Sequence, residues 1–146
     1  MLLPSPTNCV GVVFRSSCSG VTVSIKAPFG ALAWIKEHIA DYGGDPDFVA
    51  ITGGSAGGHL SSLAALTPND PQWQPGFEDA DTSVAAAVPI YGRYDWFTSQ
   101  GSGRKEFIAF LQKFVVKKPF AQNRQTYLDA SSINRLRPDA PPFFIL

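Results

Sequence analysis

The chain has 146 residues, of which 45% are hydrophobic and 16% are charged, so a packed globular domain is expected rather than a disordered chain. Twelve basic residues balance twelve acidic ones, which leaves no electrostatic footprint for nucleic acid or for an anionic membrane. No signal peptide and no transmembrane segment is evident, so a cytoplasmic location is the default expectation.

The first 29 residues form an atypical N-terminal segment. Val10–Phe14 and 21–25 have the composition of strands, and a stretch rich in serine and glycine lies between them. Cys9 and Cys18 fit no metal-site spacing, which leaves free thiols or a disulfide open. We therefore expect no metal here and two short strands.

A helix, a strand and a second helix are expected next. Residues 31–42 carry apolar side chains at helical spacing, and glycines at 43 and 44 favour a stop there. The run 48–52 is short and apolar, as in a buried parallel strand. Leucine and alanine then recur at helical spacing as far as Leu66.

The second half of the chain continues the alternation of strands and helices. Residues 67–81 read as a proline-rich loop, and 84–91 as a second buried strand. A helix is predicted over 105–118 and a weaker one over 120–130, before 141–146 begin a third buried strand. The stripe expected to bury the first of these helices consists of Phe107, Phe110, Leu111, Phe114 and Val115. This order predicts an α/β fold with a mostly parallel sheet.

The most informative motif is Gly-x-Ser-x-Gly at 53–57, between the run 48–52 and the helical residues after it. On a sharp strand-to-helix turn, small residues two before and two after a serine let the backbone pass close to itself and leave the hydroxyl exposed. The motif also fits a glycine-rich turn that only serves packing. The strand before it and the helix after it favour Ser55 as a nucleophile.

Several motifs together resemble the hormone-sensitive-lipase-like branch of the α/β-hydrolase carboxylesterases and lipases. They are the run 41–46, the sequence GGSAGGH at 53–59, and 89–92 followed by Asp95. Further stretches resemble actinobacterial carboxylesterases, namely 115–120, 129–131 and 139–144. The resemblance covers about residues 31–146.

The resemblance implies a partial α/β-hydrolase domain over residues 30–146, with no cofactor and a small-molecule ester as substrate. Ser55 would be the nucleophile, and the backbone N–H of Ala56 would be one donor of the oxyanion hole. The segment 93–130 would form a cap over the acyl pocket, in which Trp96 and Phe97 could contact substrate. The nucleophile elbow would be shaped by Gly53, Gly54, Gly57 and Gly58.

Two parts of this family's machinery do not occur in the sequence. No His-Gly-Gly loop precedes Ser55, and the triad Asp and His would follow 143–146, so we expect a fragment truncated before them. His59 is interpreted as a packing residue and His38 as a solvated helix residue. Asp95 is interpreted as a turn or cap residue. Without a base, little or no esterase activity is expected of this chain alone.

Three functional hypotheses follow from these residues. The chain is a fragment of a carboxylesterase, a catalytically inactive hydrolase remnant that acts as a binding or interaction protein, or half of a hydrolase completed by another chain. In each case the strand 48–52 would be an apolar sheet edge unless Val10–Phe14 or 21–25 covers it. We therefore expect low stability or homo-oligomerisation through an exposed edge.

Overall fold

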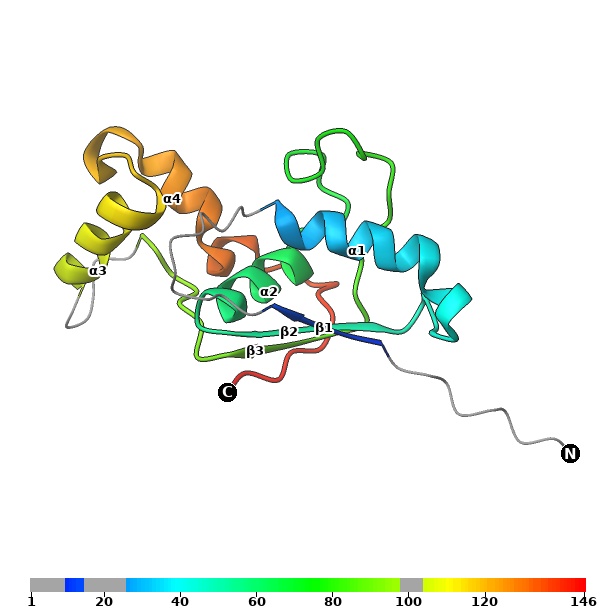
Figure 1. Ribbon diagram of the computed structural model, residues 1–146. Coiled ribbons are helices and arrows are strands. Elements are labelled where there is room, and N and C mark those ends of the chain that lie inside the picture. The colour runs from blue at the N-terminus through cyan, green and yellow to red at the C-terminus, as the bar shows by residue number, and fades with distance from the viewer. Residues whose placement is uncertain (1–9, 15–25, 98–103) are drawn as a thin grey trace, which may run out of the picture.

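The computed structural model describes residues 10–14, 26–97 and 104–146 (Figure 1). The strand expected at 21–25 and both cysteines lie outside these ranges. The helices and strands are, in chain order, β1 (Val10–Phe14), α1 (Ala27–His38), β2 (Val49–Gly54), α2 (Ala56–Leu66), β3 (Ala86–Ile90), α3 (Arg104–Phe110) and α4 (Arg124–Ala130). This alternation confirms the predicted α/β class.

Among the described residues, three strands form a parallel sheet in the order β1-β2-β3. β1 pairs with β2 from Val10 opposite Val49 to Phe14 opposite Gly53. β3 pairs along the other edge of β2, with Gly54 opposite Ile90 at its end. β2 is therefore central in the sheet. Of the two segments that could cover its apolar edge, Val10–Phe14 does so as β1.

The last residues of the chain run parallel to β3. The amide of Ala87 donates to the carbonyl of Pro142 at 3.0 Å, and the amide of Leu146 donates to the carbonyl of Pro89 at 3.2 Å. The third strand expected at 141–146 is therefore present only as an extended segment with one isolated parallel bridge, between Phe143 and Ala87, and its expected burial is wrong. Phe144, Ile145 and Leu146 are about 60% exposed (63%, 59% and 60%), because no described element packs over them.

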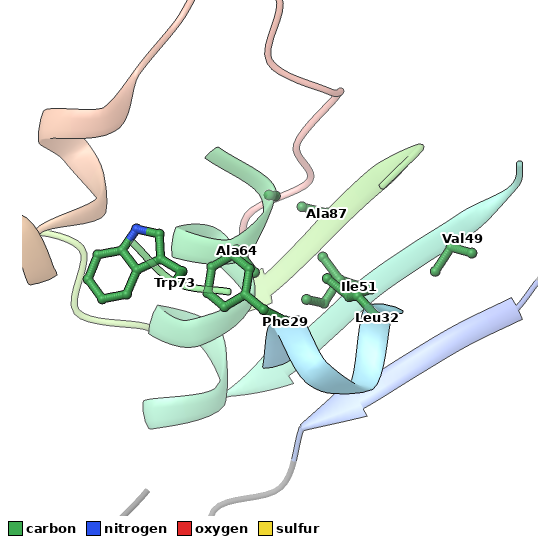
Figure 2. Close-up of a cluster of buried hydrophobic side chains, with 8 residues drawn as sticks. Phe29, Leu32, Val49, Ile51, Ala64, Trp73 and Ala87 are labelled. Carbon is green, nitrogen blue, oxygen red and sulfur yellow. The ribbon is translucent and has the colours of Figure 1, made fainter. Parts of the chain in front are cut away.

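The main hydrophobic core lies between the sheet and the two helices α1 and α2, which Figure 1 shows on the same side of the strands. Phe29 and Leu32 of α1 meet Ile51 of β2 and Ala64 of α2 in this core (Figure 2). Trp73, from the loop after α2, stacks on Phe29 with 6.2 Å between ring centroids. This core fixes α2 on the sheet, and so fixes the turn that joins β2 to α2.

A second core belongs to the segment 93–130. It is built around Trp96, Leu111, Tyr127 and Ala130, with neighbouring aromatic side chains packed against it. Figure 1 shows α3 and α4 at the left end of the molecule, whereas α1 lies toward the right. β2 and β3 run toward the end that carries α3 and α4. Within the described residues, none of the helices has both the length and the apolarity that crossing a bilayer requires.

The helix expected over 105–118 differs from the prediction. It is an α-helix from Arg104 to Phe110, and then a π-helical turn over Leu111–Val115, in which the amide of Val116 donates to the carbonyl of Leu111 at 2.7 Å. The predicted apolar stripe divides accordingly. Leu111 is buried and Phe107 packs against the second core, whereas the other three side chains of the stripe are exposed.

Candidate active site

Ser55 is the single residue between the end of β2 and the start of α2. Its φ is 56° and its ψ is −115°, a conformation that costs a residue other than glycine about 1–3 kcal/mol. Two backbone hydrogen bonds hold it, since its N–H donates to the carbonyl of Ile90 at 3.0 Å and its carbonyl accepts from the amide of His59 at 3.1 Å. The residue is exposed, as the sequence predicted for a serine on such a turn.

The glycines around Ser55 permit close backbone contacts. A Cβ on Gly53 would lie 2.6 Å from the carbonyl carbon and oxygen of Gly57, the second residue of α2. A Cβ on Gly58 would lie 2.5 Å from the carbonyl oxygen of Ile90, the group that accepts from Ser55. Any larger residue at these two positions would push α2 away from the carboxyl ends of β2 and β3.

Two further residues of the turn were not predicted as part of it. A Cβ on Gly92 would lie 2.8 Å from the backbone of Gly58, so Gly92 brings the chain after β3 against α2. Its place directly after an apolar run was a usable signal. Tyr91 has φ 37°, is 71% exposed, and its hydroxyl would lie 2.8 Å from a Cβ on Gly54. Nothing in the sequence marks a tyrosine for this conformation.

The start of α2 presents backbone donors beside Ser55. The amide of His59 is the one that reaches back to the carbonyl of Ser55, so the amides of Ala56, Gly57 and Gly58 have no carbonyl one turn before them within the helix. A helix N-terminus also carries partial positive charge. A negative oxygen developing next to Ser55 would therefore meet donors there, which suits the role expected of the Ala56 N–H.

His59 is 3% exposed and packs rather than facing solvent. Its Nε2–H donates to the carbonyl of Ala130 at 2.6 Å, and its ring stacks on Trp96 with 4.4 Å between centroids. Burial lowers the pKa of His59 below its ordinary value of 6.5, and the hydrogen bond to Ala130 opposes that shift. His59 is therefore a neutral link between α2 and the end of α4, in keeping with the packing role expected of it.

The other candidates for acid and base have local partners. His38 donates from Nδ1 to the carbonyl of Trp34 at 2.9 Å, and a carboxylate oxygen of Asp95 accepts from the amide of Phe97 at 2.8 Å. No hydrogen bond joins either histidine to the Ser55 hydroxyl in the described structure. Trp96 is 7% exposed, so it serves packing and not the substrate contact expected of it.

An exposed serine at positive φ, on a tight turn from a parallel strand to a helix whose free amides lie beside it, is the arrangement found in α/β-hydrolase esterases. The comparison with protein families agrees with this class. The chain belongs to the BD-FAE family of these enzymes, whose model matches residues 22–146. The expected family of α/β-hydrolase carboxylesterases is thereby confirmed, and the chain is a carboxylesterase-type hydrolase by family.

Relatives of known name are similar over most of this chain but are much longer. The probable carboxylic ester hydrolase LipM of Mycobacterium tuberculosis is 63% identical over 142 residues, which are 94% of this chain and 32% of LipM. Esterase LipQ of the same organism is 53% identical over 116 residues, 80% of this chain and 27% of LipQ. The chain therefore spans about a third of these relatives, in agreement with the expected fragment.

A solved structure supports the fold. The acetyl ester-xyloside bifunctional hydrolase from Caldicellulosiruptor lactoaceticus superposes with a TM-score of 0.67 over 99% of this chain and 62% of that one. The two sequences are 16% identical, so this likeness is evidence for the fold alone.

Proposed function

We propose that this chain carries the nucleophile of a carboxylic ester hydrolase. The Ser55 oxygen would attack the ester carbonyl, lose its proton to a base, and expel the alcohol to leave an acyl-serine; water would then release the acid and restore the hydroxyl. The N–H of Ala56 would stabilise the negative oxygen that forms in each step. The observation that carries this proposal is the exposed, positive-φ position of Ser55 at the start of α2.

The substrate we propose is a small carboxylic ester, and no cofactor enters this chemistry. LipM and LipQ are described as an ester hydrolase and an esterase, which supports the reaction class. We propose the segment 93–130 as a cap over the acyl side of the site. Its separate hydrophobic core and its contact with the first turn of α2, through the hydrogen bond from His59 to Ala130, support that role.

Turnover needs a base that the histidines of these 146 residues do not furnish. The sequence contains two histidines, and both rings hydrogen-bond to backbone carbonyls elsewhere. We therefore propose that hydrolysis requires residues corresponding to the part of LipM that this chain does not match. The competing proposals are an inactive remnant that binds ligands or partners, and a half-enzyme completed by a second chain.

A chimera tests the proposal. The unmatched parts of LipM are joined to the two ends of this chain, and hydrolysis of p-nitrophenyl acetate is measured for the chimera and for the chain alone. We expect turnover by the chimera only, with a loss of about a thousandfold or more in Ser55→Ala. Ser83→Ala, in the loop before β3, is the matched control and should leave the rate unchanged. A chimera that melts cooperatively but shows no turnover would favour the inactive remnant.

We also propose that copies of the chain associate through the exposed sheet edge beside β3. The amides of Phe144 and Leu146 donate to carbonyls of β3, so this segment forms the outer edge of the sheet. Its last three side chains are apolar and exposed. Light scattering after gel filtration should show association that Ile145→Lys reduces, because a charged residue blunts an edge. A monomer at all concentrations would exclude this association.

A further inference from the structure

Three apolar side chains of the stripe that was expected to be buried are exposed instead. They are Phe110, Phe114 and Val115, which are 49%, 57% and 42% exposed, and four exposed lysines accompany them along the chain, namely Lys105, Lys113, Lys117 and Lys118. We call these seven residues the Phe–Lys face. It begins in α3, continues through the π-helical turn and ends with the two lysines just after that turn, at the outer end of the molecule in Figure 1. Nothing in the main core or in the second core covers it.

The aromatic rings of this face form a continuous row. Phe107, which packs on the second core, lies 6.5 Å from Phe110 between ring centroids, and Phe110 lies 5.4 Å from Phe114. The row therefore begins in the second core and continues outward into solvent. A contiguous exposed apolar strip of this kind marks a surface that binds something.

The charge of this region is strongly unbalanced, although the whole chain is neutral. Between positions 104 and 118 there are five basic residues and one acidic residue, Glu106, which gives +4; the rest of the chain therefore carries −4. The Nζ of Lys113 lies 5.0 Å from the centre of the Phe114 ring, so charge and apolar surface occupy the same place. A partner that binds the Phe–Lys face must accordingly be negatively charged and must accept apolar rings.

We propose that the Phe–Lys face binds the surface of an anionic lipid bilayer. Exposed phenylalanines can enter the apolar boundary of the lipid, while lysine stems extend along it and leave their ammonium groups among the headgroups. A second copy of the chain is a poor occupant, because a two-fold contact would place the lysines of one copy against those of the other. The proposal does not depend on ester hydrolysis by Ser55.

Binding in this way would also orient the molecule. The Phe–Lys face and the start of α2 lie toward the same end of the structure in Figure 1. His59 and Trp96 connect the two regions, because the His59 ring stacks on Trp96 and Trp96 in turn packs on Phe107. A chain held at a bilayer by this face would have its candidate nucleophile on the membrane side.

The test is sedimentation of the 146-residue chain with vesicles of phosphatidylcholine alone or with about 30% phosphatidylglycerol, the anionic lipid that should attract the lysines. We expect partition into the anionic vesicles only, and its loss at high salt. Lys113→Glu/Lys117→Glu/Lys118→Glu should lower the partition by about a hundredfold or more, because each lost lysine accounts for about fivefold and each new carboxylate adds repulsion from the anionic surface. Phe110→Ser/Phe114→Ser should lower it by about tenfold or more.

The matched control is Trp34→Ser/Tyr42→Ser. It removes two other exposed and neighbouring aromatic rings, 49% and 73% exposed with 6.2 Å between centroids, from α1 and the turn after it. This variant should partition like the wild type, and far-ultraviolet circular dichroism checks the fold of each variant. Equal partition into both kinds of vesicle, or an unchanged partition of both Phe–Lys variants, would overturn the proposal. So would dimerisation of the wild type that Phe110→Ser/Phe114→Ser abolishes, because the face would then bind protein.

Discussion

The close approach of α2 to β3 makes Gly58→Ala a demanding test of the turn geometry. The added Cβ would lie 2.5 Å from the carbonyl oxygen of Ile90, which is 0.9 Å inside the 3.4 Å at which ordinary contact begins. Backbone also lies 3.1 Å away at Gly53 and at Gly92, so the methyl group has no side to move toward. Overpacking of this kind lowers the free energy of unfolding by about 1–3 kcal/mol. Because rigid backbone surrounds the added methyl group on several sides, we expect a loss of about 3 kcal/mol for Gly58→Ala.

Thermal unfolding followed by circular dichroism measures this effect. About 2–4 °C per kcal/mol is expected at this chain length, so Gly58→Ala should lower Tm by roughly 6–12 °C. The matched control is Gly30→Ala in α1, where the nearest atom to the added Cβ is 3.9 Å away, in Phe77. An alanine inside a helix is better than glycine by about 0.5–1 kcal/mol, so this variant should be slightly stabilised. Equal Tm changes in the two variants would refute the close-approach argument.

Two further predictions concern Ser55 and His59. Because glycine adopts positive φ without strain, Ser55→Gly should be more stable than Ser55→Ala by about 1–2 kcal/mol in urea unfolding, and equal stabilities would contradict the strain at this residue. Because burial lowers the pKa of His59, the unfolded chain binds the extra proton first as the pH falls through 6.5, so the wild type should lose stability progressively below that pH. His59→Gln keeps a donor for Ala130 but does not titrate, so the free energy of unfolding of this variant should vary less than that of the wild type between about pH 7 and about pH 5.5. The same pH dependence in both proteins would contradict the buried neutral histidine.

The parts of the fold that were predicted well are those with strong local signals. The run 48–52 and the helix that ends at Leu66 were placed within a few residues, because apolar periodicity and the glycine motif both act locally. The register of Val10–Phe14 on β2 was not predictable, because pairing between strands depends on contacts distant in sequence. The exposure of Phe144 and Ile145 was also missed, because their apolar character describes what they could bury and not what packs on them.

The candidate site shows the same division. Gly53, Ser55 and Gly57 follow from the motif, since the turn requires small residues at fixed offsets. Tyr91 and Gly92 come from the end of β3, and only the pairing of β2 with β3 brings them to Ser55. The predicted burial of Phe114 and Val115 was wrong for a physical reason, because a period of 3.6 residues assumes a continuous α-helix and the π-helical turn at Leu111–Val115 interrupts it.

The identity of the nucleophile is tested most directly by locating a covalent adduct. The chimera with LipM is treated with a fluorophosphonate, which reacts with activated serines, and the modified peptide is identified by mass spectrometry. We predict a single adduct on the peptide that contains Ser55, and none in Ser55→Ala. An adduct on a different serine, in a chimera that hydrolyses p-nitrophenyl acetate, would contradict the assignment of Ser55 as the nucleophile.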